Sequence, residues 1–469
     1  MSFYCRAGSN DIVAVSTATA HLTILGGGPA GLAAGHFARK TGLPFILFEA
    51  ADRTGGNAVT FQEGPFRFDS GAHRFHDRDQ AMTAEVQHLI GPDLLECEIP
   101  SVIFDDGRWV GFPLRPANLI GAIGPLAFAR AAASLLRARL FTTPADDNFE
   151  ALACHTYGRD IATRYLLGYS EKLWGLPCRQ LSPAIAGARL RGLSLSTFLL
   201  EALRQPARAT SHLDGRFYYP RLGFGTIAER LAESCGFERL RTHSRVTRIL
   251  HDGSRITAVE INRNETVSVD EVCCTLPLPL TATLLSPSLP DSVLEDAHGL
   301  RFRNVLLVAL ILNRPSVTKY GSVYFPALDS PVTRVYEPKN RSADMAPPDR
   351  TMLVAEVPCD SADPIWRASD SQLIERVKSA LAPCGWFSSG DVAGGVVKRM
   401  AGAYPVLETG AELRVRRLLS AIERFENLHL IGRNGLFTYA HTHAMLRFGF
   451  DTVARLQSRT PATVAYEQV

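Results

Sequence analysis

The stretch that decides the fold is residues 21–57, HLTILGGGPAGLAAGHFARKTGLPFILFEAADRTGGN. It opens with a short apolar run, Leu22–Leu25, which predicts a buried strand. Small and apolar residues at helical spacing follow over Ala30–Ala38. A second apolar run over Leu43–Phe48 predicts another buried strand, which ends at Glu49. Together these segments predict one strand–helix–strand unit.

Between the first strand and the helix, Gly26, Gly28 and Gly31 have the G-x-G-x-x-G spacing. The first glycine permits a tight turn, the second lets a pyrophosphate approach the backbone, and the third lets the helix pack closely on the strand. The helix N-terminus offers unpaired N–H groups to phosphates, and Glu49 can accept hydrogen bonds from ribose hydroxyls. A glycine turn alone is common, but the complete order of strand, glycines, helix, strand and acid predicts a dinucleotide site.

The segment that follows narrows down the dinucleotide. Residues 53–57, RTGGN, resemble the R-x-G-G segment of FAD enzymes related to amine oxidases and UDP-galactopyranose mutases. The resemblance implies that Arg53 meets an FAD phosphate and that Gly55 and Gly56 let the chain pass the flavin, with Asn57 in the same cofactor-binding segment. Dehydrogenases that use only NAD usually lack this R-x-G-G segment. A Gly-Gly surface turn is the alternative interpretation.

Residues 69–76, DSGAHRFH, resemble the G-x-H-x-F-H loop of the mutases. In that family the loop lies against the flavin ring, so the resemblance implies that His73 is a catalytic residue near the reactive flavin nitrogen. His73 and His76 could instead form a metal pair, but no third ligand is evident, and we expect no metal. A capping histidine without a chemical role is a further alternative.

Residues 168–175, GYSEKLWG, resemble the G-Y-T-E-K-x-W-G stretch of the same mutases. The resemblance implies that Tyr169 and Trp174 help to hold a nucleotide-sugar, whereas the alternative is core packing in a helical hairpin. Arg189 and Arg191 follow at about the spacing of a diphosphate-binding arginine of the family. The sequence does not decide which of the two matches, or whether either is more than surface charge.

Residues 333–339, TRVYEPK, resemble the mutases' T-R-I-x-E-x-K segment, whose arginine binds the substrate diphosphate. Arg334 holds that position here. A guanidinium suits this role because its fork donates two parallel hydrogen bonds to phosphate oxygens. The alternative interpretation is a cross-strand Arg–Glu pair.

Residues 432–439, GRNGLFTY, resemble the mutases' G-R-x-G-x-Y-x-Y motif. The resemblance implies that Gly432 and Arg433 contact the cofactor, that Arg433 also holds the substrate diphosphate, and that Tyr439 contacts the substrate phosphates as a catalytic and binding residue. In FAD proteins of this type, the segment around Val246 touches the adenine through its backbone.

Composition bounds the remaining possibilities. The net charge of +3 gives no reason to expect a nucleic-acid partner. Nine cysteines without a CxxC pair predict free thiols and a cytoplasmic location. The longest apolar zone, Leu119–Leu136, is interrupted by Arg130, which argues against a transmembrane helix. A helix packed in a substrate domain is then expected, with an interfacial helix as the alternative.

The predicted fold class is α/β, with a Rossmann-like FAD-binding domain built from separated segments, a helical insertion and an antiparallel-sheet substrate domain. Strand patterns dominate residues 300–360, and helical patterns dominate residues 115–205. The expected organisation is a loose N-terminal arm over 1–20, an FAD-binding domain over 21–111, 216–285 and 395–460, a helical part over 112–215 and a sheet part over 286–394.

The six motifs together resemble the mutase and protoporphyrinogen-oxidase-like branch of the flavin amine oxidase superfamily. The first interpretation is a mutase that interconverts pyranose and furanose forms of a nucleotide-sugar through reduced FAD, with NAD(P)H as a candidate reductant. The alternative is an FAD-dependent oxidoreductase that oxidises an amine or C–C substrate. His441-Thr442-His443 replaces the mutases' D-M-D cluster, which favours the oxidoreductase, whereas the arginines favour the mutase. The sequence leaves the sugar and the oligomeric state open.

Overall fold

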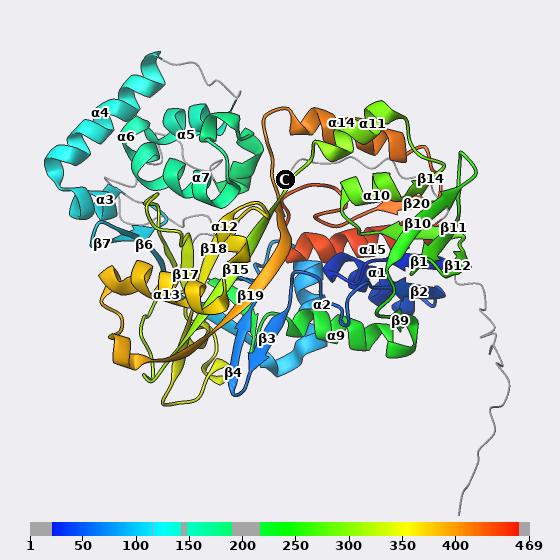
Figure 1. The fold of residues 1–469 in the computed structure, drawn as a ribbon, viewed down its shortest axis with the longest axis horizontal. Helices are drawn as coiled ribbons and strands as arrows, with labels where there is room; N and C mark the ends of the chain where they lie inside the picture. Colours follow the sequence, from blue (N-terminus) through cyan, green and yellow to red (C-terminus); the bar gives the residue numbers. More distant parts are fainter. Residues whose placement is uncertain (1–20, 115, 142–147, 190–215, 459–469) are drawn as a thin grey trace, which may run out of the picture.

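The computed structural model describes residues 21–114, 116–141, 148–189 and 216–458. The arm expected over 1–20 lies outside the described residues. In Figure 1 a parallel sheet with its covering helices lies at the right, and a larger mixed sheet lies at the lower left. A group of helices lies above the larger sheet, at the upper left.

The predicted strand–helix–strand unit forms the centre of the parallel sheet. Each apolar run is short and consists mainly of residues that favour strands. Each strand pairs in parallel with its neighbours, as expected for strands buried on both faces. The five strands are, in sheet order, β20 (Leu428–Leu430), β13 (Glu271–Cys274), β1 (Leu22–Leu25), β2 (Phe45–Phe48) and β9 (Leu240–Arg241).

Successive side chains of these strands enter different cores, because side chains alternate across a strand. Ile24 and Leu47 pack with the helices on one face, and Leu25 and Phe48 pack with the second layer of strands on the other. The covering helices are α1 (Pro29–Lys40), α9 (Thr226–Cys235) and α15 (Thr442–Ser458). The second layer is an antiparallel hairpin extended at both edges, in the order β12 (Glu265–Ser268), β11 (Ile256–Ile261), β10 (Val246–His251) and β14 (Leu285–Ser286).

The larger sheet has seven strands, and its two central long strands are almost wholly buried. Most of its pairs are antiparallel, as predicted, but β16 pairs in parallel with β6. Its order is β19 (Val392–Pro405), β15 (Phe302–Leu312), β18 (Thr351–Cys359), β17 (Arg334–Tyr336), β16 (Ser322–Tyr324), β6 (Ser101–Asp105) and β7 (Arg108–Phe112).

This pairing moves two of the expected domain boundaries. Strand β6 precedes residue 111, β7 crosses it, and most of β19 follows residue 395, yet all three belong to the larger sheet rather than to the FAD-binding segments. The reason is non-local. Ten residues of the fourteen-residue strand β19 pair with β15, which lies about ninety positions earlier in the chain, and no local sequence pattern indicates such a partner.

The remaining elements surround the two sheets. Two small antiparallel pairs are β3 (Thr60–Glu63) with β4 (Phe66–Asp69) and β5 (Leu94–Glu98) with β8 (Arg216–Pro220). The other α-helices are α2 (Gln80–Ile90), α3 (Pro116–Ile123), α4 (Pro125–Phe141), α5 (Phe149–Tyr157), α6 (Arg159–Ile161), α7 (Gly168–Trp174), α10 (Leu278–Leu284), α11 (Asp291–His298), α12 (Pro364–Arg367), α13 (Asp370–Leu381) and α14 (Ala411–Ile422). Within the described part of the chain, none of the helices combines the length and the apolar character that crossing a membrane requires.

Candidate active site

The glycine turn after β1 has the geometry that the sequence predicts. Gly26 has a φ of +99°, and a Cβ on it would lie 2.3 Å from Oγ1 of Thr275. A Cβ on Gly31 would lie 2.0 Å from the carbonyl oxygen of Gly26. In contrast, a Cβ on Gly28 would meet no protein atom within 4 Å. The first and third glycines are therefore required by the protein itself, and the second faces open space that a phosphate can fill.

The carboxylate of Glu49 is held directly beside this turn. It accepts hydrogen bonds from the backbone N–H of Gly27 at 2.7 Å and of Ala51 at 2.8 Å. The carbonyl oxygen of Glu49 accepts from the N–H of Ser244 at 2.8 Å, which brings the start of β10 at Val246 close to the same edge. The acid and the predicted adenine-contacting segment thus lie together.

The R-x-G-G segment packs against the glycine turn. The N–H of Gly55 donates to the carbonyl oxygen of Gly27 at 2.8 Å, and a Cβ on Gly56 would lie 3.1 Å from the Cα of Gly28. Both glycines have positive φ, at +108° and +53°, so other residues would strain the backbone here. Arg53 is exposed next to this contact.

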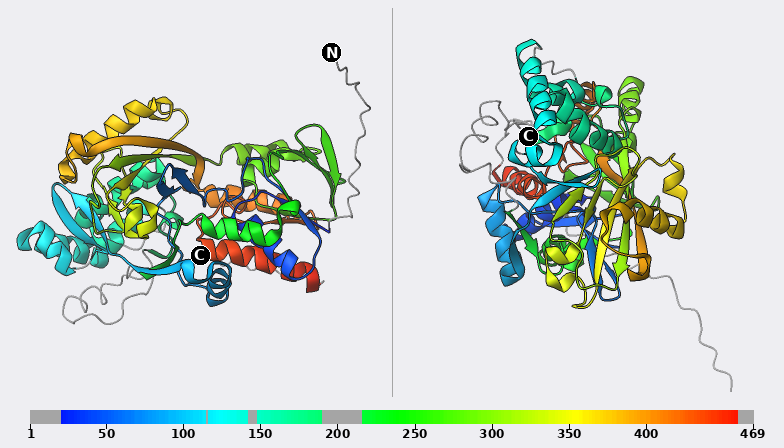
Figure 2. Two further views of the ribbon diagram at one scale, coloured as in Figure 1. Left: turned by 90° about the horizontal axis from the view of Figure 1, so that it is seen from below. Right: turned by 90° about the vertical axis from the view of Figure 1, so that its left-hand side faces the viewer.

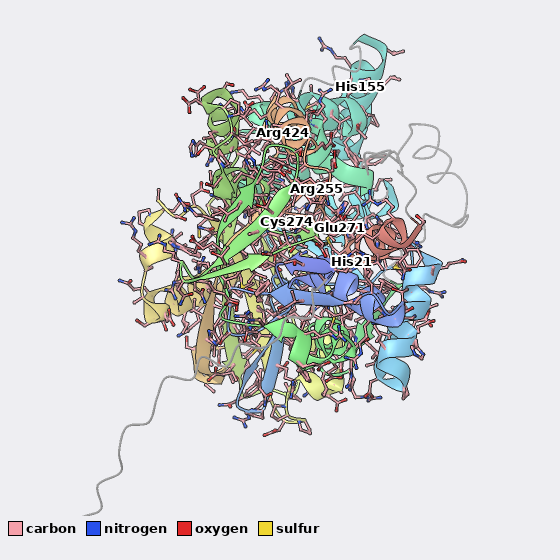
Figure 3. The ribbon with its side chains drawn as sticks, turned by 90° about the vertical axis from the view of Figure 1, so that its right-hand side faces the viewer. His21, His155, Arg255, Glu271, Cys274 and Arg424 are labelled. Atoms are coloured by element: carbon pink, nitrogen blue, oxygen red, sulfur yellow. The ribbon has the colours of Figure 1, made fainter. Side chains whose placement is uncertain are left out.

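The last part of the cofactor edge comes from the far end of the chain. Gly432 follows β20 with a φ of +86°, and a Cβ on it would lie 3.3 Å from the Cβ of Ala30 at the start of α1. Figure 3 marks the two ends of β13, with Glu271 at its start and Cys274 at its end. Glu271 pairs with Nε2 of His429 at 2.8 Å at the edge where the strands begin. The glycine turn, Glu49 and Gly432 all lie at the opposite, carboxyl-terminal edge, where α/β sheets bind ligands.

These features fit FAD. The carboxyl-terminal edge offers open space at the second glycine, the N-terminus of a twelve-residue helix, and a fixed carboxylate on the neighbouring strand. Unpaired N–H groups at a helix start bind phosphates, and the carboxylate can accept ribose hydroxyls.

The predicted flavin-side histidine is held on the loop after β4. The Nε2 atom of His73 lies 3.1 Å from Oγ of Ser70, which donates to the carbonyl oxygen of Asn57 at 2.6 Å. The imidazole also stacks on Phe224, with ring centroids 4.9 Å apart. The histidine loop is therefore tied to the R-x-G-G segment through Asn57.

Burial and nearby cations lower the pKa of His73 to about 3. Burial has the largest effect, followed by the positive charges of Arg433, Arg334 and Arg341. Because charged guanidinium groups oppose a second positive charge, the imidazole is neutral at physiological pH. Arg341 belongs to none of the recognised sequence motifs; it is 3% exposed, and its guanidinium lies 4.6 Å from the ring centroid of Tyr336.

Arg334 adopts the alternative that the sequence left open, a cross-strand pair. Its Nε and Nη2 atoms donate to the carboxylate of Glu356 on β18, at 3.0 and 2.8 Å. Burial is the largest single effect and would lower the pKa of Arg334, but the negative charge of Glu356 and the nearby tyrosines, Tyr169 first among them, together hold the pKa well above its usual value. The bidentate contact leaves the third nitrogen, Nη1, outside the pair.

Glu356 is a site residue that lies outside the recognised sequence motifs. Its carboxylate also accepts from the backbone N–H of Ala72 at 2.9 Å, one residue before His73. It is 2% exposed, on a strand whose nine residues are all buried. The signal that could have found it is the single carboxylate within the otherwise uncharged run TMLVAEVPC, since buried acids need a partner.

Aromatic side chains from four segments meet beside this ion pair. The rings of Tyr169 and Tyr324 meet edge-on, with centroids 5.7 Å apart. The ring of Trp174 meets those of Tyr404 and Tyr439 edge-on, with centroid distances of 6.1 and 6.2 Å. Burial, and next the negative charge of Glu356, raises the pKa of Tyr404 to about 12. Tyr404 and Tyr324 were not predicted, because each lies on a strand without a recognisable motif.

Two cations hold the helix that carries Tyr169 and Trp174. Nζ of Lys172 donates to the carbonyl oxygens of Ser330 at 3.1 Å and Val332 at 2.8 Å. The buried Arg303 donates to carbonyl oxygens at the end of α7. The helix is thereby fixed against the larger sheet.

Arg433 links the aromatic group to the cofactor edge. Its guanidinium lies over the ring of Tyr404 at 5.4 Å and donates to the carbonyl oxygen of Ala403 at 2.5 Å. Nearby, His441 contacts Tyr439 edge-on at 6.1 Å and stacks on His443 at 5.8 Å. Two stacked imidazoles thus adjoin the aromatic group at Tyr439.

Not every predicted residue is placed. Arg189 ends a short 3-10 helix, Pro183–Arg189, and nothing is described of its side chain. Arg191 lies outside the described residues. The other predicted residues form two neighbouring groups, one along the cofactor edge and one around Arg334 and His73.

Comparisons with known proteins agree with this architecture. The chain is 22% identical to coproporphyrinogen III oxidase of Bacillus subtilis (strain 168) over 440 residues, which cover 86% of this chain and 90% of that protein. A crystal structure of reduced UDP-galactopyranose mutase matches with a TM-score of 0.83 and 21% identity, over 95% of this chain and 97% of that one. A putative protoporphyrinogen oxidase from Exiguobacterium sp. 255-15 matches with a TM-score of 0.73 and 18% identity, over 94% and 99%.

These structural likenesses support the predicted fold class, and the cofactor follows from the family. The model of the flavin-containing amine oxidoreductase family matches residues 29–433, which span the glycine turn, the histidine loop and the arginine-bearing strands. The protein is an enzyme whose cofactor is FAD. The chain belongs to the flavin-containing amine oxidoreductase family.

Proposed function

We propose that this flavoenzyme acts on a nucleotide-sugar and interconverts its pyranose and furanose forms. One observation carries the proposal. Arg334 is joined through Glu356 to the backbone N–H of Ala72, one residue before His73, and the positive charges of both Arg334 and Arg433 lower the pKa of His73. Two guanidinium groups beside the loop that carries His73 suit a diphosphate. Its negatively charged oxygens accept hydrogen bonds from guanidinium N–H groups, which also neutralise the charge.

In this proposal the side chains hold and orient the substrate. Nη1 of Arg334 and the guanidinium of Arg433 neutralise the diphosphate, and the hydroxyl of Tyr439 donates to a phosphate oxygen. Trp174 and Tyr169 flank the sugar. When bound in its reduced form, FAD supplies the electron pair that the reaction requires at the anomeric carbon.

Glu356 and His73 serve this arrangement indirectly. The Glu356 carboxylate fixes the plane of the Arg334 fork and ties it to the histidine loop through Ala72. His73 stays neutral, so it adds no charge beside the flavin and offers one N–H donor and one acceptor. Both residues are positioning groups in this proposal.

The second candidate is an oxidation of an amine or C–C substrate. Two observations favour it. Arg334 already has a carboxylate partner, which reduces the net positive charge available to a diphosphate. In addition, His441 and His443 stand where the mutases have acidic residues, so the substrate that meets Tyr439 differs from theirs in this region.

The experiment titrates UDP into the purified holoenzyme in its oxidised and its chemically reduced form and records the flavin spectrum. The expected result is saturable binding that weakens about tenfold in Arg334→Lys, because lysine loses the planar fork but keeps the charge. Arg417→Lys is the matched control. Arg417 forms a similar bidentate pair with Asp296, but it joins α14 to α11, away from the site.

Absence of a UDP response in both redox states would reject the nucleotide-sugar proposal. An equal UDP affinity in Arg334→Lys and Arg417→Lys would show that Arg334 does not contact the nucleotide. In the first case, candidate amines and C–C substrates are tested for anaerobic bleaching of the flavin, which reports hydride transfer without any assumption about the product.

A further inference from the structure

One long stretch of the chain has a marked charge imbalance. Between Asp106 and Asp146 there is no acidic residue, and five arginines occur. The whole chain, in comparison, has 50 basic and 47 acidic residues. The stretch includes α3 and α4, which lie at the outer edge of the molecule in Figures 1 and 2.

Helix α4 presents apolar side chains outward as well as inward. Its inner face is buried, with Ala131 4% and Leu135 6% exposed. Leu126, Leu136 and Leu140 are 77%, 50% and 66% exposed. At about 100° per residue, positions 126, 136 and 140 fall within roughly 80° of one another, so they share one face.

Cations border that face. Arg130 and Arg137 are exposed, and their positions lie within about 40° of Leu126 on the helix circumference. On the neighbouring helix, Ile120 is 41% exposed. An apolar stripe flanked by arginines is the arrangement of helices that lie in the interfacial region of a bilayer.

The charge distribution selects one occupant for this surface. A second copy of the chain would bring another arginine-rich, acid-free segment against the first, and like charges repel. A bilayer that contains acidic phospholipids offers negative headgroups to Arg130 and Arg137, together with an apolar layer for the leucines.

We propose that α3 and α4 bind the surface of an anionic phospholipid bilayer, with α4 lying in the plane of the headgroups. Leu126, Leu136 and Leu140 enter the boundary of the acyl region, and Arg130 and Arg137 contact phosphates. The FAD-binding sheet then lies on the side of the molecule away from the bilayer, since α4 and β1 are at opposite sides in Figure 1. This binding is independent of the substrate identity proposed above.

The test is co-sedimentation of the holoenzyme with vesicles of phosphatidylcholine alone or mixed with phosphatidylglycerol. We expect binding to the mixed vesicles only. Arg130→Gln with Arg137→Gln should weaken it by about 30-fold, from roughly fivefold per charge. The triple variant Leu126→Gln, Leu136→Gln, Leu140→Gln should bind the mixed vesicles at least about tenfold more weakly than the parent protein.

Matched controls change similar side chains elsewhere. Leu328→Gln with Leu413→Gln removes leucines that are 64% and 53% exposed, and Arg376→Gln with Arg416→Gln removes two exposed charges. Both control variants should bind the mixed vesicles like the parent protein. The flavin spectrum and the melting temperature verify that every variant is folded and holds FAD.

Three outcomes would overturn the proposal. The first is the absence of binding to mixed vesicles. The second is equal weakening in the α4 variants and their controls. The third is a concentration-dependent dimer, detected by light scattering, that the triple leucine variant abolishes, because the face would then be an interface between two copies of the chain.

Discussion

The pair of Arg334 with Glu356 is the feature on which the chemistry of the site depends at the scale of single residues. Each partner lies directly opposite the other on neighbouring strands, and both are largely buried. A buried ion pair is stabilising only while both partners are present, because removing one leaves an uncompensated charge in a medium that solvates it poorly. The pair should therefore respond asymmetrically to single and double substitutions.

We expect Glu356→Gln to lower the free energy of unfolding by roughly 3 kcal/mol, because it leaves Arg334 charged without a carboxylate. The double variant Glu356→Gln with Arg334→Met should recover part of this loss. Urea unfolding monitored by fluorescence measures both. Arg417→Met is the comparison, because that pair is more exposed and should cost less than about 1 kcal/mol. Equal losses in both pairs would contradict the buried-pair interpretation.

His73 should make the protein sensitive to mild acid. Its pKa is about 3 in the folded protein and about 6.5 when unfolded, so the folded state binds fewer protons below pH 6.5. No stability is lost above pH 6.5, and stability is lost progressively as the pH falls from 6.5 towards 3. Between pH 6.5 and 5 the expected loss is about 2 kcal/mol. His73→Asn should lack this component; an unchanged pH dependence in that variant would refute it.

Residues that belong to short local motifs could be predicted from the sequence, and residues defined by pairing could not. The glycine turn and Glu49 lie where the motif predicts, because local spacing determines them. Glu356 and Tyr404 enter the site through strand register, which depends on partners far away in the sequence. Arg334 was found, but its partner was not, so the sequence could only state the ion pair as an alternative.

At the scale of elements, the turn between β1 and α1 contains glycines that are needed for different reasons, one for protein packing and another for cofactor binding. Gly31 meets the protein's own backbone, whereas Gly28 faces open space. Two otherwise identical substitutions should therefore separate folding from cofactor binding.

We expect Gly28→Ala to fold but to purify without flavin, because its methyl group occupies the space that a phosphate would take. Gly31→Ala should both lose flavin and lower the melting temperature, since its Cβ would lie 2.0 Å from the Gly26 carbonyl oxygen. Flavin absorbance per protein and thermal melting of the apoproteins distinguish the two. Gly394→Ala, where a Cβ meets nothing within 4 Å, is the control. Full flavin occupancy in Gly28→Ala would place the phosphates elsewhere.

Among the elements, most of the strands and helices that the sequence indicates form within a few residues of their expected bounds. The strand–helix–strand unit is the example: the strand expected over Leu22–Leu25 is β1, the helix expected over Ala30–Ala38 lies within α1, and the strand expected over Leu43–Phe48 contains β2. The helix expected over Leu119–Leu136 is divided between α3 and α4 at Gly124, which has a φ of +81°. Another exception is β19. Its residues alternate only weakly between buried and half-buried positions, and β15 supplies its partner.

At the scale of the whole molecule, the cysteines report on the packing of both cores. Eight of the nine cysteines are described, and none of these eight is in a disulfide. Burial raises the pKa of all eight thiols, that of Cys235 to about 12. Since the thiolate is the reactive form, these thiols should be unreactive while the fold is intact.

We expect these eight thiols to react with DTNB at pH 7.5 at least about 100-fold more slowly in the native protein than in urea. Complete reaction in urea should give nine thiols per chain. Mass spectrometry of the modified peptides identifies any exception. Rapid native labelling at Cys97, Cys235 or Cys273 would show that the helix layer opens readily, contrary to the packing described.

The parallel sheet is closed by β20 and α15, which are the last strand and the last helix among the described residues. A Cβ on Gly449 of α15 would lie 2.5 Å from the backbone nitrogen of Ala34, so this helix rests directly on α1. During synthesis on the ribosome, β1 and α1 emerge about 400 residues before β20 and α15 do. The nascent chain must therefore keep the apolar face of α1 from aggregating throughout translation, and a prematurely terminated polypeptide would carry the nucleotide motif without ever completing the sheet that surrounds it.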